Sequence, residues 1–177
     1  MVPAPGPQPI ASRPHMPGYG IVGPGEGSGL LPWSWAEERL TSSHDYWVTT
    51  TWPDGRPHVM PVWGMWHGSC LWFSSSGTSR KTLNLERDPR CSVATDRPSE
   101  PVVLEGRAEV VKDLEVLEAV LDLENRKYGT SYTMEMLDPA VNACFRVRPS
   151  WVFGLAAADF TGSPTRWVFG EQGPSGD

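Results

Sequence analysis

The stretch from Phe73 to Asn84 holds the residues whose types and spacing could do chemistry. An apolar strand runs there into a small polar loop, residues 74–77, and a helix is expected to begin at about Ser79. Free backbone N–H groups at a helix start favour an anion. Arg80 and Lys81 fall in the first turn, where a cation opposes the helix dipole. A bound phosphate would give both cations a partner, so the pattern favours a phosphate site.

Two interpretations of this helix start remain open from the residues alone. In the first, a phosphate binds, and Asn84, four residues after Arg80 on the same helix face, extends the polar contact. In the second, the helix start is solvated and both cations lie in water. The first is favoured because cations in this turn contribute little to helix stability by themselves.

No other group of residues carries a stronger signal for catalysis. His67 and Cys70 flank a turn, but no second pair lies nearby to complete a zinc site. The sequence holds no G-x-S-x-G motif and no evident nucleophile–base pair. We therefore predict no metal and no catalytic side chain, and we expect a cofactor to carry any reaction.

A G-x-G-x-x-G pattern at residues 18–23 resembles a dinucleotide-binding fingerprint. That fingerprint requires a strand before it and a helix after it. Here prolines stand on both sides, at Pro17 and Pro24. The pattern is therefore rejected as a dinucleotide site.

Composition excludes several function classes for this chain of 177 residues. Its formal net charge of −6 disfavours binding to nucleic acid and to anionic membranes. No apolar run is long enough to span a bilayer, and the N-terminus lacks a signal-peptide pattern. The three cysteines, without a C-x-x-C motif, indicate reduced thiols. We expect a cytoplasmic protein with no nucleic-acid partner and no membrane partner.

The chain should divide into three segments. Residues 1–32 hold eight of the eighteen prolines and seven of the eighteen glycines, so they should form an extended or disordered arm that buries little. Residues 33–170 should form one domain around a single core. Residues 171–177 should be a flexible tail.

Alternating, β-branched and aromatic residues predict a mainly β fold for the domain. Strands are expected at 46–51, 56–66, 70–73, 91–95, 102–111 and 144–154, with a last short one at 166–169. Helices are expected at 34–43, 79–88 and 113–128, with a short helix or turn at 131–140. Ser34 and Glu37 would form a capping box on the first helix. These elements suit a small closed barrel.

The strand at 56–66 is apolar on both faces, which is unusual for a short antiparallel hairpin. Such a strand needs cover on both sides. One face should fill the barrel, and a partner subunit or a bound ring should cover the other. Pro61 cannot donate to a ladder, so it indicates an edge or an opening. The two faces are Met60, Val62 and Trp66, and Val59, Trp63 and Met65.

Four stretches of the domain, in the expected order, carry a resemblance to a known family. They are 49–63 with its Pro53-Asp54-Gly55 turn; Ser79-Arg80-Lys81 through Asp88-Pro89-Arg90; 103–111; and Phe145–Pro149 with Phe160-Thr161-Gly162 and Thr165-Arg166-Trp167. Together they resemble the pyridoxamine 5'-phosphate oxidase-like proteins over about residues 34–169. The resemblance implies a six-stranded antiparallel split β-barrel with a few flanking helices.

Two details of the sequence indicate which branch of this family the chain resembles most. The Gly-x-Ser-Arg-Lys form at 77–81 and the Thr-Gly-x-x-Thr-Arg-Trp ending at 161–167 look most like the actinobacterial branch that uses the deazaflavin coenzyme F420. That branch implies a homodimer with two cofactor sites at the subunit interface. This chain has Gly77-Thr78 where the branch has a larger or basic residue. The resemblance therefore does not predict which residues contact the cofactor's tail.

The resemblance nominates cofactor-binding residues in three groups. The phosphate group comprises Thr78, Ser79, Arg80, Lys81 and Asn84. The ring group comprises Met60, Pro61, Val62 and Trp63, with Ser74 and Ser75 beside it. The third group, Trp167 with Arg166, would reach in from the other subunit.

Three functions follow as expectations. In the first, reduced F420 passes a hydride to an electron-poor small-molecule substrate stacked on its ring. In the second, the same barrel holds FMN and works as an oxidase or reductase. In the third, the protein carries a flavin, deazaflavin or tetrapyrrole without turnover.

Overall fold

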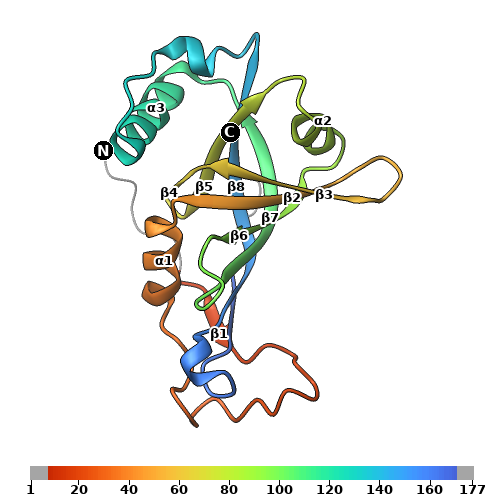
Figure 1. Ribbon diagram of the computed structural model, residues 1–177, viewed down its shortest axis with the longest axis vertical. Coiled ribbons are helices and arrows are strands. Elements are labelled where there is room, and N and C mark those ends of the chain that lie inside the picture. The colour runs from red at the N-terminus through yellow and green to blue at the C-terminus, as the bar shows by residue number, and fades with distance from the viewer. Residues whose placement is uncertain (1–7, 171–177) are drawn as a thin grey trace.

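The computed structural model describes residues 8–170, which form a mainly β domain with three α-helices (Figure 1). None of the helices in this part of the chain is long and apolar enough to cross a membrane. The helices are α1 (Trp33–Ser42), α2 (Arg80–Arg87) and α3 (Leu114–Tyr128), with short 3-10 turns at Met134–Leu137 and Ala157–Asp159. The strands are β1 (Ile10–Ser12), β2 (Asp45–Thr51), β3 (Pro57–Trp63), β4 (Met65–His67), β5 (Cys70–Ser76), β6 (Arg90–Thr95), β7 (Val102–Val111), β8 (Asn142–Gly154) and β9 (Thr165–Val168).

The strand pairs are antiparallel, and β8 pairs with three other strands, β5, β7 and β9. The main path through the sheet is β1-β9-β8-β7-β6-β2-β3, and β5 with β4 branches from β8. The first half of β8 pairs with β5 and its second half with β9, while β7 pairs with both halves. The predicted mainly β antiparallel fold is confirmed. Within residues 8–170 the sheet has nine strands where six were expected for the barrel, because β1 comes from the arm, Gly64 separates β4 from β3, and β9 lies between β1 and β8.

Two apolar clusters fill the domain. The larger includes residues of α1 and of most strands, and its largest fully buried side chains are Tyr46, Phe73, Phe145 and Trp167. The smaller packs the apolar face of α3 against β4, β5 and β8. All three cysteines are buried and unpaired, as the scattered positions in the sequence predicted.

The three predicted helices are present, with one change at the first. α1 begins at Trp33, and no side chain caps it. Ser34 therefore lies inside the first turn, and the expected capping box with Glu37 does not form. The expectations for α3 are confirmed, because Asp113 caps its start and Gly129 ends it in the left-handed conformation.

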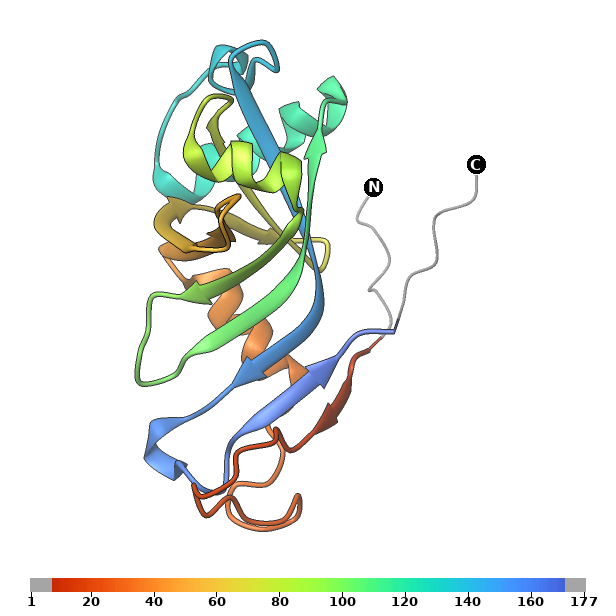
Figure 2. The ribbon, with the colours of Figure 1, turned by 90° about the vertical axis from the view of Figure 1, so that its right-hand side faces the viewer.

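The N-terminal arm is part of the fold over its described residues, 8–32. β1 pairs with β9, so the arm extends the sheet (Figure 2). The Arg13 guanidinium donates to the carbonyls of Pro164, Gly23 and Glu26 at 2.8, 3.0 and 3.2 Å. The arm buries little, as expected, since Leu31 is the one buried residue among 8–32. Over these residues it is extended and not disordered, because one cation binds the carbonyls that a Pro/Gly-rich chain leaves unpaired. The first seven residues and the expected tail at 171–177 lie outside the described residues.

Replacing Arg13 by methionine should release the arm. Each hydrogen bond from a charged donor contributes about 1.5–3 kcal/mol, and the variant loses several of them. Backbone amides of residues 18–29 should exchange with solvent deuterium faster than in the wild type, as measured by mass spectrometry. Arg97→Met, at an exposed arginine, is the matched control and should change nothing. Unchanged exchange in folded Arg13→Met would show that the arm is held by other contacts.

The last turn of α3 holds the junction between β3 and β4. The ladder is interrupted at Gly64, where a Cβ would lie 2.9 Å from the Trp72 carbonyl oxygen. Lys127 Nζ donates to the Gly64 carbonyl at 2.7 Å, and the Gly64 N–H donates to the Tyr128 hydroxyl at 2.8 Å. The expected single strand at 56–66 is therefore two strands, joined at a residue with no room for a side chain.

Lys127 should make stability depend on pH. Burial lowers the pKa of Lys127 to about 8, although Asp96 and Asp45 act in the opposite direction. The unfolded chain keeps this proton up to the ordinary value of 10.5. Between about pH 8 and 10.5 the unfolded state therefore binds more protons, and the free energy of unfolding should rise with pH.

The measurement compares the wild type with Lys127→Met by urea denaturation from pH 7 to about 10.5. The stability of the wild type relative to the variant should increase over the upper part of this range. Taking the difference cancels the buried thiols of Cys91 and Cys144, whose pKa burial raises to about 12 and which act with opposite sign. A difference that stays flat would contradict the assignment.

Candidate functional site

The helix start predicted as an anion site is a compact polar cluster between the end of β5 and the beginning of α2. Ser79 is the N-cap residue, and its Oγ accepts a hydrogen bond from the Thr82 backbone N–H at 3.3 Å. Ser75 Oγ lies 2.9 Å from Ser79 Oγ, and Lys81 Nζ donates to Ser75 Oγ at 3.0 Å. One loop therefore gathers two hydroxyls and one ammonium at a helix start.

The Lys81 ammonium has no acidic partner among the described residues. It is partly buried, and burial lowers the pKa of this lysine. A partly buried cation is stabilised by an anion that brings the opposite charge. The cluster can therefore bind a phosphate or carboxylate through Lys81 Nζ, the serine hydroxyls and the free N–H groups of the first turn.

Arg80 contacts a different element from Lys81. Its guanidinium carbon lies 4.1 Å from the ring centre of Trp52, at the tip of the β2–β3 hairpin. The guanidinium of Arg56 lies 4.3 Å from the same ring. Trp52 thus binds two arginines by cation–π contact. The two adjacent cations of the helix start are separated, with Lys81 at the serines and Arg80 at the hairpin tip.

Asn84 does not face the anion site, contrary to the prediction. The residue is 1% exposed, and its Nδ2 donates to Thr50 Oγ1 of β2 at 3.0 Å. Its Oδ1 is buried without a hydrogen-bond partner. Asn84 is four residues after Arg80, but this part of α2 packs on β2. Tertiary packing therefore turns the amide into the core.

The other two nominated residues of this loop, Thr78 and Ser74, do not belong to the cluster around Lys81. Thr78 is exposed, and its hydroxyl lies 3.1 Å from the Ser76 hydroxyl. Ser74 is partly buried and pairs with Cys144 of β8. The structure therefore brings Ser75, Ser79 and Lys81 together and leaves Thr78 and Ser74 at the margin.

The four residues nominated for the ring lie on β3, which among the strands of residues 8–170 pairs only with β2 and so has one free edge. Met60 and Val62 share a face with the buried Val48, whereas Pro61 and Trp63 share the opposite face. Met60 is 45% exposed and Trp63 39% exposed. A flat ring could therefore contact all four residues only along the free backbone edge, and not through all four side chains.

The chain matches the sequence pattern of a known protein family over the region that holds this site. A profile described as pyridoxamine 5'-phosphate oxidase matches residues 36–156, more than half of the chain. The chain belongs to this family. The matched region includes β3, the loop between β5 and α2, α2 itself and all of β8. Among curated proteins, no match is found.

Solved structures agree with the pyridoxamine 5'-phosphate oxidase fold. A putative 5-nitroimidazole antibiotic resistance protein from Bacteroides thetaiotaomicron superposes with a TM-score of 0.62 at 17% identity, covering 76% of this chain and 84% of that one. A conserved hypothetical protein from Mycobacterium tuberculosis has a TM-score of 0.58 at 24% identity, covering 82% and 93%. An F420 reductase has a TM-score of 0.55 at 27% identity, covering 66% of this chain and 94% of its own.

Trp167 does not lie where the resemblance to the oxidase family placed it. Its side chain is fully buried in its own protomer, paired with Val152 and with its ring centre 5.6 Å from that of Trp33. A fully buried indole cannot contact a cofactor held by a second subunit. Arg166 is partly buried next to it, and its guanidinium donates to Ser12 Oγ of the arm at 3.0 Å. The expected role of Arg166 toward a partner stays a prediction.

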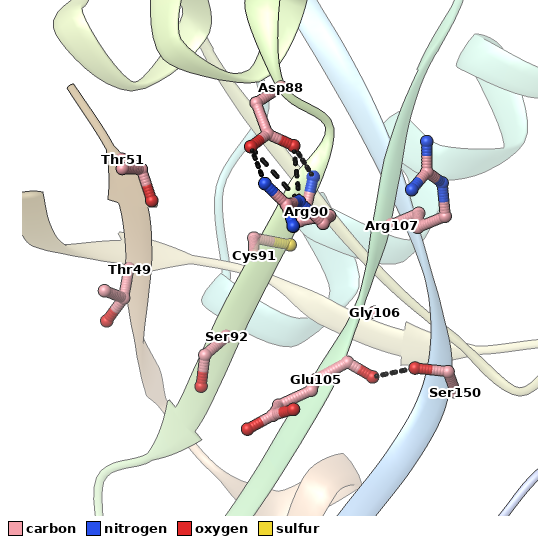
Figure 3. A pocket seen from close by; sticks show the side chains of 10 residues that line it. All are labelled: Thr49, Thr51, Asp88, Arg90, Cys91, Ser92, Glu105, Gly106, Arg107 and Ser150. Atoms are coloured by element: carbon pink, nitrogen blue, oxygen red, sulfur yellow. Dashed lines mark hydrogen bonds and ion pairs between the residues drawn. The ribbon is translucent and has the colours of Figure 1, made fainter. Parts of the chain in front are cut away.

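A groove of about 550 Å³ lies over β2, β6, β7 and β8 (Figure 3), and none of its lining residues is a nominated cofactor-binding residue. Arg90 Nη2 forms an ion pair with Asp88 Oδ2 at 2.6 Å and holds the pKa of Asp88 below its ordinary value. Glu105 and Arg107 add one charge of each sign to the lining, so the groove has no excess of cations to attract an anion. The lining residues are Thr49, Thr51, Asp88, Arg90, Cys91, Ser92, Glu105, Gly106, Arg107 and Ser150.

Sequence reasoning missed three residues next to the candidate site. Trp52 stands directly before the predicted hairpin turn, and an aromatic residue there could have been a signal for a contact with the nearby arginines. Lys127 and Tyr128 end a helix more than sixty residues after Gly64. No local pattern indicates their contact with the β3–β4 junction.

Proposed function

We propose that this protein is an oxidoreductase that binds coenzyme F420 by its phosphate at the start of α2. It would pass a hydride between the deazaflavin ring and an electron-poor small molecule. The observation that carries the proposal is the Lys81 ammonium, which hydrogen-bonds to Ser75 beside the N-cap Ser79 and lacks an acidic partner among the described residues. A cofactor phosphate would supply the missing charge.

The ring would lie along β3. Its free edge offers backbone N–H and C=O groups, and Met60 offers exposed apolar area beside them. When bound, the cofactor supplies the hydride chemistry. The residues of the chain bind the phosphate, orient the ring and keep water from it, which is how a protein without an acid or base at the site can accelerate such a reaction.

FMN is the second candidate because it also joins a phosphate to a flat ring. F420 is supported over FMN by the likeness to a structure described as an F420 reductase, at 27% identity. FMN is supported by the description of the matched family, which names pyridoxamine 5'-phosphate oxidase. Either cofactor could also be held without turnover, which would make the protein a carrier.

A homodimer is part of the proposal. Trp47, Val59 and Trp63 lie on one face of the β2–β3 hairpin and are 46%, 52% and 39% exposed. Large apolar side chains gathered on one face mark a contact surface. A second copy would cover this face and bring β3 to the subunit interface. Sedimentation velocity should therefore show a dimer, and a monomer at all concentrations would contradict this part of the proposal.

Titration of the purified protein with oxidised F420 and with FMN, followed by the fluorescence of each ring, tests the cofactor. F420 should bind more tightly by about tenfold or more, equivalent to about 1.4 kcal/mol. Tight binding of FMN alone would replace F420 by FMN, and binding of neither would overturn the proposal. Reduced F420 is then mixed with enones and quinones. Turnover should appear as oxidised F420, and binding without any turnover would support the carrier.

A further inference from the structure

Trp63, the last residue of β3, is held in place by α3. Its indole stacks on the Tyr128 ring with centres 4.3 Å apart and planes 6° apart. His44 contacts both rings edge-on, with centre distances of 6.3 Å to Trp63 and 5.2 Å to Tyr128. Stacking on one face and an edge contact restrict the rotamer of the indole. Tyr128 therefore sets the orientation of Trp63 at the end of the proposed ring site.

The backbone after Trp63 depends on the same helical turn. Both polar groups of Gly64 are paired with side chains of α3, because its N–H donates to Tyr128 Oη and its carbonyl accepts from Lys127 Nζ. Tyr128 Oη also lies 2.7 Å from the His44 carbonyl oxygen. Loss of Tyr128 would leave the Gly64 N–H without its partner, and loss of Lys127 would leave the Gly64 carbonyl with only the Tyr128 hydroxyl, at 2.9 Å. The β3–β4 junction is thus fixed by two side chains that are distant in sequence.

Lys127 extends this contact into the core. Its Nζ also donates to the hydroxyl of Tyr46 at 3.0 Å, and Tyr46 is fully buried on β2, the strand that pairs with β3. The Tyr46 hydroxyl in turn donates to the carbonyl of Leu40 in α1. The junction is therefore connected to β2 and α1 through one ammonium group.

From these contacts we propose that Lys127 and Tyr128 are positioning residues for the cofactor ring. They hold Trp63 and the free edge of β3 in the conformation that the ring requires, and they do not touch the cofactor. The proposal rests on the proposed function, since it concerns the same site. Neither side chain hydrogen-bonds to the start of α2, so they should act on the ring and leave the phosphate unaffected.

The test separates binding of the ring from binding of the phosphate. The probes are F420 or FMN, whichever the wild type binds, and inorganic phosphate as a competitor. Tyr128→Leu should weaken cofactor binding about tenfold and shift the absorption spectrum of the bound ring. Its inhibition constant for phosphate should stay within about twofold of the wild type. Lys127→Met should act in the same direction, and Tyr128→Phe, which keeps the stacking on Trp63, should restore part of the affinity and spectrum.

Matched controls come from the same region. Arg126→Met and Tyr132→Leu remove an exposed cation and an exposed aromatic ring close to the pair, and both should bind the cofactor like the wild type. Circular dichroism confirms folding. If Tyr128→Leu does not fold, Tyr128→Phe and Lys127→Met decide through the same comparison of ring and phosphate.

Three results bear against the proposal, and they can be told apart. Wild-type affinity and spectrum in the folded variants would overturn it and leave the proposed function intact. An equal loss of cofactor and phosphate binding would show a general effect on stability and would also overturn it. Binding of neither F420 nor FMN by the wild type would overturn the proposed function, and this inference with it.

Discussion

Replacing Lys81 by alanine should weaken cofactor binding about 10- to 150-fold. The Lys81 ammonium hydrogen-bonds to Ser75 Oγ, which in turn lies 2.9 Å from Ser79 Oγ at the start of α2. A charge-assisted hydrogen bond contributes about 1.5–3 kcal/mol, which corresponds to this range of affinity. Arg80→Ala should weaken binding by less than about threefold, because that guanidinium lies over Trp52. The dissociation constants are measured by fluorescence titration at constant ionic strength.

Two further variants make this comparison specific. Lys81→Met keeps most of the aliphatic side chain and should lose as much affinity as the alanine variant, because the charge is what the phosphate requires. Lys112→Ala removes an exposed lysine elsewhere and should bind like the wild type. Equal losses of cofactor affinity in Arg80→Ala and Lys81→Ala would show that both cations contact the phosphate. Unchanged cofactor affinity in Lys81→Ala would show that the phosphate does not bind at the start of α2.

The parts of the site that could be predicted from the sequence are those determined locally. Ser79 caps α2 as expected, because a hydroxyl between a polar loop and a helical run satisfies free N–H groups within the same few residues. Lys81 lies two residues after that cap, in the first turn, so its nearness to the loop follows from helix geometry alone. The extended segment at β3 and its edge position were likewise indicated by Pro61.

The direction of individual side chains could not be predicted in the same way. Arg80 and Asn84 share a helix face by spacing, yet one contacts Trp52 and the other Thr50. Which face of a helix is buried depends on the strands it packs against, and these are distant in sequence. The arm followed the same rule, since Arg13 binds the carbonyl of Pro164, which lies more than 150 residues away.

Trp167 shows how a family resemblance can place a residue in the right element and on the wrong side. β9 is a strand, so its side chains alternate between two faces. Trp167 faces the core, where a Cβ on Gly154 would lie 2.8 Å from the indole. Arg166 lies on the other face. The sequence ending Thr165-Arg166-Trp167 does not say which of the two neighbours points inward, and burial of the larger apolar ring decides it.

Replacing Trp167 by alanine should lower the free energy of unfolding by about 3–5 kcal/mol, since the largest side chain of the core would leave a cavity. Trp167→Phe should cost less, because Nε1 has no hydrogen-bond partner to lose. Urea denaturation at fixed protein concentration measures both. Where the variants are folded, cofactor affinity should stay within about twofold of the wild type, because the indole lies inside its own protomer. Wild-type stability with weak cofactor binding would instead place Trp167 in a partner's site and contradict the core assignment.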